Sequence, residues 1–163
     1  MIFLTVGSHE PFDRLVKAVD DWCQKHPGTE VFGQVTGRGT YRPQYFQFVQ
    51  NLDISAFEDS LNEAEILISH AGMGTIISAL IKSKPIVVMP RQGKLHETRN
   101  DHQIATASRL AEKKGIVVAK DVQDVPVAIA LAQAMLNVPA MERLSQFAQP
   151  RLLAYLSGVF EGG

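Results

Sequence analysis

Short strand-like runs alternate with helix-patterned stretches along the whole chain, and this alternation constrains the fold most. Six runs are predicted to be strands: residues 1–7, 30–35, 45–52, 65–69, 84–90 and 116–119. Most are continuously apolar and rich in Val and Ile, as strands buried on both faces are. The sequence therefore predicts an α/β fold in which a Rossmann-like parallel sheet carries helices on both faces.

Helices are predicted between and after these strands, over residues 11–26, 55–64, 74–83, 100–115, 122–136 and 139–160. The first has apolar residues at helical spacing, and the last is interrupted by Pro150. Neither a repeat nor a linker divides the chain. We expect a single domain over 1–163, in which 139–163 is a C-terminal helical tail.

Composition excludes several classes of protein. The formal net charge of -1 argues against a nucleic-acid partner, because such proteins usually carry a basic excess. Cys23 is the one cysteine, the histidines lack metal-site spacing, and there is no Asp-x-Asp pair, so neither metal nor cofactor is expected. The apolar runs fall short of the ~18 residues that a membrane span needs. The N-terminus lacks signal-peptide features, so we expect a cytoplasmic protein.

The stretch ISHAGMGTIISAL, residues 68–80, places a glycine-bearing turn between a predicted strand and a predicted helix. Gly72 and Gly74 can take positive φ and expose main-chain N–H groups. Thr75 and the first helical turn add donors and a partial positive charge. This pattern favours a phosphate or pyrophosphate, although the spacing fits neither the P-loop nor the full dinucleotide fingerprint. A tight turn packed for steric reasons is the alternative.

A second polar segment, PRQGKLHETRNDHQ, runs from a strand end into a helix start and contains Arg91. Asn100 or Asp101 is expected to cap the helix. His102 and Gln103 have no evident role in folding, and an amide such as Gln103 suits the paired hydroxyls of a sugar. A solvated surface loop is the alternative.

A third strand end, VGSHEPFDRL, offers Gly7 and Ser8 for close approach of a ligand and His9 or Glu10 for contact with a substrate. His9 alone is as well explained by an exposed loop histidine. Ligands of parallel sheets bind at the carboxyl ends of strands, so we expect the three segments to lie near one another.

Two stretches, ISHAGMGTIISALIKSKPIVVMP and NDHQIATASRLAEKKGIVV, resemble the C-terminal, donor-binding domain of family 28 glycosyltransferases. The short length and the start FLTVGSHEPFDRLVKAVD are similar to the soluble subunits of two-subunit transferases that act on dolichol-linked oligosaccharide. Bacterial counterparts in capsule and exopolysaccharide assembly are similar as well. The likeness covers roughly residues 1–120.

The resemblance implies one half of a GT-B fold, which holds a UDP-sugar. A separate, membrane-anchored subunit would supply the acceptor-binding half. The diphosphate would lie on the turn formed by Ser69, His70, Gly72, Met73, Gly74 and Thr75. Asp101, His102 and Gln103 would meet the donor sugar or its phosphates. The family commonly has a ribose-binding glutamate where this chain has Ser78, so uridine recognition is less well supported than phosphate binding.

We therefore expect a glycosyltransferase subunit that transfers a hexose or hexosamine from a UDP-sugar to a lipid-linked acceptor in surface polysaccharide synthesis. A partner subunit would recruit it to the inner face of the membrane, and residues 151–160 are expected to dock on that partner. The reaction would be inverting and metal-independent, with His9 or a partner residue as base. The rival hypothesis is a non-catalytic nucleotide-sugar-binding or stabilising subunit; a nucleotide-binding oxidoreductase is a weaker third.

Overall fold

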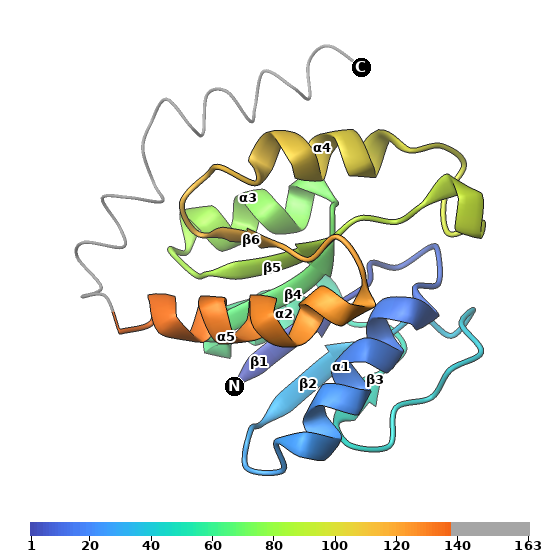
Figure 1. Cartoon of the computed structure of the whole chain (residues 1–163). Coiled ribbons are helices and arrows are strands. Elements are labelled where there is room, and N and C mark those ends of the chain that lie inside the picture. Colours follow the sequence, from blue (N-terminus) through green and yellow to red (C-terminus); the bar gives the residue numbers. More distant parts are fainter. Residues whose placement is uncertain (138–163) are drawn as a thin grey trace.

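The computed structural model describes residues 1–137, so the tail 139–163 and its proposed docking segment lie outside the described residues (Figure 1). Six strands form one sheet in the order β3-β2-β1-β4-β5-β6, and every neighbouring pair is parallel. The strands are β1 (Ile2–Thr5), β2 (Val31–Gln34), β3 (Gln47–Val49), β4 (Ile66–His70), β5 (Ile86–Met89) and β6 (Ile116–Val118). This order confirms the predicted Rossmann-like sheet.

Helices follow the strands at the predicted places, with small shifts at their ends. They are α1 (Asp13–Lys25), α2 (Ile54–Glu63), α3 (Met73–Ile81), α4 (His102–Leu110) and α5 (Val125–Met135), with short 3-10 turns η1 (Gly93–Leu95) and η2 (Val122–Asp124). Helix α4 ends five residues before the predicted boundary at Gly115, which has φ +86° and leads into β6. Among residues 1–137, no helix combines the length and apolarity needed to cross a bilayer.

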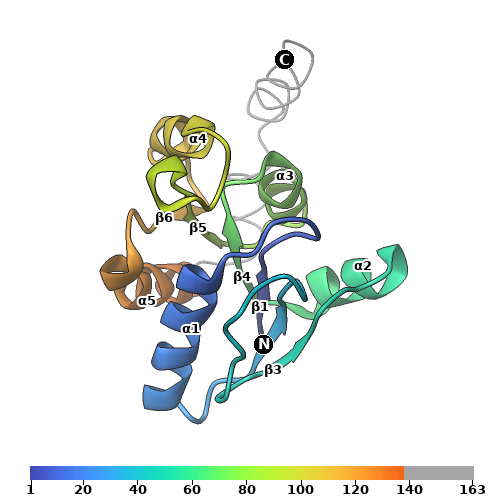
Figure 2. The same cartoon turned by 90° about the vertical axis from the view of Figure 1, so that its right-hand side faces the viewer.

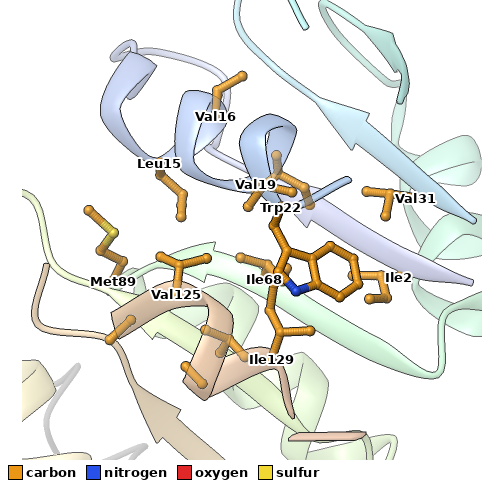
Figure 3. Packing of buried hydrophobic residues seen from close by; sticks show 14 of the residues in the cluster. Ile2, Leu15, Val16, Val19, Trp22, Val31, Ile68, Met89, Val125 and Ile129 are labelled. Atoms are coloured by element: carbon orange, nitrogen blue, oxygen red, sulfur yellow. The ribbon is translucent and has the colours of Figure 1, made fainter. Parts of the chain in front are cut away.

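The alternation of side chains along each strand divides the core into two layers. In β1, Ile2 and Leu4 face α1 and α5, whereas Phe3 faces α2 and α3. Figure 2 shows α1 and α5 on one side of the sheet and α2, α3 and α4 on the other. Figure 3 shows the first layer, in which Trp22 of α1 lies near Ile129 of α5 above the sheet. Coverage on both faces explains the continuously apolar strands.

The connection from β2 to β3 has no helix, and acidic residues of α1 hold it in place. Asp20, which is buried, accepts hydrogen bonds from Tyr41 Oη at 2.7 Å and from the amide of Tyr45 at 2.8 Å. Asp13 accepts from the amide of Thr40 at 2.8 Å. These bonds satisfy a buried carboxylate and fix the loop that starts at the carboxyl end of β2.

Candidate functional site

Three loops meet where β1, β4 and β5 end at the same edge of the sheet. Thr5 pairs with Ser69 across β1 and β4, and His70 pairs with Met89 across β4 and β5. The sheet grows from β1 toward β2 on one side and from β4 toward β5 on the other. The edge between β1 and β4 is therefore the topological switch point, where ligands of such sheets bind. The predicted adjacency of the strand ends is confirmed.

His70 occupies the centre of this edge, between the two glycine-bearing loops. A Cβ on Gly7 would lie 3.2 Å from His70 Cε1, and one on Gly72 would lie 2.9 Å from the same atom and closer still to Nε2. Burial and, to a smaller extent, the positive charge of Arg91 lower the pKa of His70 to about 4, although a main-chain hydrogen bond with Thr5 acts in the opposite direction. The imidazole is therefore neutral at physiological pH.

The glycines have different roles from those predicted. Gly72 has φ -88°, and Gly74 lies within helix α3 and is not among the residues with positive φ, so neither uses the left-handed region. Gly7, with φ +80°, does. Gly72 and Gly7 instead make room for the His70 ring. A Cβ on Gly74 would meet nothing within 4 Å, so its surface is open to a ligand.

The start of α3 offers free main-chain donors. The first helical hydrogen bond runs from Ile76 N to Gly72 O at 3.3 Å, and the amide of Gly72 itself donates to His70 O at 2.8 Å. The amides of Met73, Gly74 and Thr75 precede that helical bond and have no acceptor in the described part of the chain. The donor set thus begins at Met73, one residue later than the glycine pattern predicted. Three unpaired amides at a helix start form an anion-binding arrangement.

A hollow of about 300 Å³ lies beside this helix start. Gly7, Ser8 and Thr75, all predicted site residues, line it from the β1 and α3 sides. The start of α2 closes it with Leu52, Asp53, Ile54, Phe57 and Glu58. The α2 side thus combines apolar and aromatic side chains with carboxylates, a combination that suits a ring with hydroxyl substituents.

Arg91, just after β5, is a buried cation without a direct ion pair in the described part of the chain. Its side chain is inserted under the β1 loop, where Nη2 donates to Val6 O at 2.7 Å and to Glu10 O at 2.6 Å. The residue is 4% exposed, and Nε has no partner among the described residues. Burial lowers the pKa of Arg91, while Glu10 and Glu97 raise it. No carboxylate in residues 1–137 approaches Arg91 within 4.0 Å, so Arg91 forms no direct ion pair there, and Glu10 and Glu97 act on its charge only from a distance.

Gln103 has a structural contact that the sequence interpretation missed. Its Oε1 accepts a hydrogen bond at 3.2 Å from the amide of Arg91, and the residue is 5% exposed. The prediction that Gln103 has no role in folding is therefore wrong, because this carboxamide satisfies a buried main-chain donor at the end of β5. The side-chain nitrogen is the part left for a ligand.

Asp101 and His102 are exposed, and their hydrogen bonds remain within the loop from β5 to α4. Asp101 is the N-cap residue of α4, but its Oδ1 accepts from the amide of Gly93 at 2.7 Å. Asn100 Oδ1 accepts from the amide of His102 at 3.2 Å and also contacts His102 Nδ1. Asp101 thus holds the predicted N-cap position, whereas Asn100 supplies the side-chain acceptor for the first helical amide. In the described part of the chain, neither Asp101 nor His102 forms a hydrogen bond with the β1 loop or the β4–α3 turn.

The β1 loop presents His9 to solvent. Ser8 Oγ lies 2.8 Å from His9 Nδ1, which leaves Nε2 as the ring nitrogen available for proton transfer. Arg38, from the loop after β2, donates from Nη1 to His9 O at 3.2 Å. Ser69, by contrast, is fully buried in β4 with its hydroxyl 3.4 Å from His70 Nδ1, so it can reach a ligand only through that ring.

Residues missed by the sequence interpretation include Arg14, Arg38 and Glu58. Glu58 lines the hollow and pairs with Lys82 at 3.0 Å. Nothing in the local sequence distinguishes these charges from an ordinary solvated helix or loop surface. Within residues 1–137, no group of three or more His, Cys, Asp or Glu side chains is arranged to hold a metal ion.

Comparison with known proteins identifies the family. The glycosyltransferase family 28 C-terminal domain matches residues 1–143 of the chain. The chain belongs to that family. The family 28 match spans all six strands and the three loops at the carboxyl edge of the sheet.

A curated relative and two solved structures are similar to the chain. The human "UDP-N-acetylglucosamine transferase subunit ALG13" is 35% identical over 119 residues, which are 67% of this chain and 10% of the human protein. The chain thus matches about a tenth of that relative's length. The glycotransferase of kitacinnamycin shares the fold at TM-score 0.65 and 21% identity, covering 95% of this chain and 39% of the other. An NMR structure of ALG13 matches at TM-score 0.58 and 17% identity, covering 82% and 85%.

Proposed function

We propose that the chain is the donor-binding subunit of a glycosyltransferase that uses a UDP-sugar. The observation that carries this proposal is the buried cation of Arg91, which forms no direct ion pair among residues 1–137. A buried charge without a partner is costly, and the folded protein tolerates it best where an anionic ligand completes the site. Unpaired amides at the start of α3 point to the same kind of ligand. The human relative is named for UDP-N-acetylglucosamine.

The diphosphate would lie on the amides of Met73, Gly74 and Thr75, against the open face of Gly74. The positive charge of the buried Arg91 stabilises the diphosphate through its electrostatic field, and the neutral His70 adds no charge of its own. Loss of UDP leaves negative charge on the diphosphate, which preorganised amides and a fixed cation stabilise without reorganisation. This arrangement makes departure of UDP independent of a metal ion.

The two ends of the donor would lie on opposite sides of this turn. The hollow beside Thr75 would take the uridine, whose ring suits the wall formed by Phe57 and Leu52 and whose ribose hydroxyls suit Glu58. Glu58 would thus supply the carboxylate that Ser78 lacks. The donor sugar would lie toward α4, where Asp101, His102 and the Gln103 amide nitrogen offer hydrogen bonds.

Transfer would proceed by displacement with inversion. The acceptor hydroxyl gives its proton to His9 Nε2, its oxygen forms the new bond to the anomeric carbon, and UDP leaves with the electron pair of the broken bond. Ser8 orients the ring through Nδ1. His9 lies at the solvent-facing side of the site, where an acceptor held by another protein would approach.

The acceptor would be a lipid-linked sugar held by a membrane-anchored partner subunit, which also recruits this chain to the inner face of the membrane. The relative's name describes a subunit and therefore implies a partner. The names of the relatives do not mention capsule or exopolysaccharide, so we propose a surface-polysaccharide acceptor only as one form of lipid-linked sugar.

Transfer assays with a panel of UDP-sugars, with and without membranes that contain the partner, test the proposal. We expect transfer that requires both the chain and the membranes, and that His9→Gln abolishes while leaving UDP binding intact. His26→Gln is the matched control, because His26 stacks on Trp22 at the far end of α1. Full activity of the His9→Gln variant would place the base in the partner. UDP binding without any transfer would favour the non-catalytic alternative.

A further inference from the structure

Arg14 of α1 connects three segments that are distant in sequence. Its Nε and Nη2 donate to the two carboxylate oxygens of Glu97 at 2.7 and 2.8 Å. Its Nη1 donates to Asp121 Oδ1 at 2.9 Å, and Nη2 also reaches Pro90 O at 3.2 Å. One guanidinium therefore joins α1 to the loop after β5 and to the loop after β6.

Glu97 extends this connection into the main chain of the β5–α4 loop. Its Oε2 accepts a hydrogen bond at 2.9 Å from the amide of Gln92, next to Arg91. The loop also turns through His96, whose φ of 56° is uncommon for a residue other than glycine. The carboxylate thus closes the turn from Gln92 to Glu97, within the irregular segment that separates Arg91 from Gln103.

The Arg14–Glu97 pair differs from an ordinary surface ion pair. The two side chains are 17% and 11% exposed, whereas Lys17 and Asp21, on the same helix, are 57% and 54% exposed. Burial disfavours the charge on Arg14, but the bonds to Glu97 and Asp121 more than compensate and raise its pKa. A two-bond guanidinium–carboxylate contact fixes orientation as well as distance.

The two arginines at this edge are also related through one ring. The guanidinium carbon of Arg14 lies 5.4 Å from the centre of the Phe12 ring, and that of Arg91 lies 5.1 Å from it. Arg14 forms direct ion pairs with Glu97 and Asp121, whereas Arg91 forms none with residues 1–137. The charge of Arg14 is thus used within the protein, whereas that of Arg91 can still act on an anionic ligand through its field.

We infer that Arg14 and Glu97 are positioning residues that set the β5–α4 loop for the donor sugar. This inference rests on the proposed function, in which the sugar lies toward Asp101–Gln103. Neither residue needs to touch the ligand. The pair acts through the path from Gln92 to Asp101, whose side chain in turn accepts from the amide of Gly93.

The test uses the full chain with Arg14→Lys, Glu97→Gln and both changes together. Calorimetry measures the affinities for UDP and for UDP-N-acetylglucosamine, and hydrogen exchange measures the amides of residues 92–101. Arg14→Lys keeps the positive charge but cannot form the two-bond contact with the Glu97 carboxylate, so it separates the effect of geometry from that of charge. Lys17→Gln removes the exposed pair on the same helix and is the matched control.

We expect each variant to bind UDP-N-acetylglucosamine about tenfold more weakly, with UDP affinity changed less than about twofold. Because the residues act as one unit, the double variant should be no weaker than the poorer single variant. The loop amides should exchange faster in all three, and Lys17→Gln should match the wild type.

Equal weakening for both nucleotides, or unchanged loop exchange, would overturn the positioning role. An Arg14→Lys variant indistinguishable from the wild type would overturn it as well. Absence of UDP binding by the wild-type chain would instead contradict the proposed function itself. The two failures are therefore distinguishable.

Discussion

The ring of His70 fills the space in which a side chain on Gly72 would stand. This relationship explains why a glycine follows two residues after the histidine in the β4–α3 turn, since the φ of Gly72 does not require one. Gly72 therefore makes room for the His70 ring, whereas Gly74 of the same turn faces open space.

Alanine at these two positions should therefore have opposite consequences. Gly72→Ala forces a Cβ against the His70 ring and should lower the free energy of unfolding by about 1–3 kcal/mol. Gly74→Ala adds a Cβ in open space within a helix and should raise it by roughly 0.5–1 kcal/mol, while weakening UDP binding. Urea unfolding and calorimetry measure both quantities. Loss of stability in Gly74→Ala with normal UDP affinity would make Gly74 a structural glycine.

The buried imidazole should make stability depend on pH. The pKa of His70 is about 4 in the folded chain, against about 6.5 in an unfolded one. Between these values the unfolded chain binds a proton that the folded chain does not, so stability is complete above pH 6.5 and falls as the pH drops toward 4. The wild type should lose roughly 1–2 kcal/mol more than His70→Asn between pH 7 and pH 5. Identical losses in both proteins would mean that His70 titrates normally.

Gln103 should contribute to the stability of the fold, apart from any role in sugar binding. Gln103→Ala leaves the buried amide of Arg91 without its acceptor and should cost about 1–3 kcal/mol. The adjacent, exposed His102 is the control, and His102→Ala should change stability by less than about 0.5 kcal/mol. Thermal unfolding measures both. If Gln103→Ala is as stable as the wild type, the bond to the Arg91 amide does not stabilise the fold and Gln103 serves ligand binding alone.

The sequence predicts the layers of the fold better than the connections at the site. Strands such as β4 and β5 are apolar on both faces, so their burial follows from composition alone. The three loops are predicted as ligand-bearing because polar and small residues follow buried strands. Their adjacency needs the strand order, which local patterns do not determine.

The contacts that the sequence could not indicate are those between distant side chains. Arg14 and Glu97 are separated by 83 positions, and each alone is typical of an exposed charge. Gln103 has the residue type of a sugar ligand, but its carboxamide oxygen is taken by a main-chain donor 12 positions away. The fit of His70 between Gly7 and Gly72 likewise depends on the pairing of β1 with β4.

Calorimetric titration of the chain with UDP and with uridine, both in excess chelator, tests the central claim most directly. If Arg91 and the α3 amides form the diphosphate site, UDP binds without a divalent metal and uridine binds at least about tenfold more weakly. Equal affinities for UDP and uridine, or UDP binding only after Mg²⁺ or Mn²⁺ is added, would contradict that account.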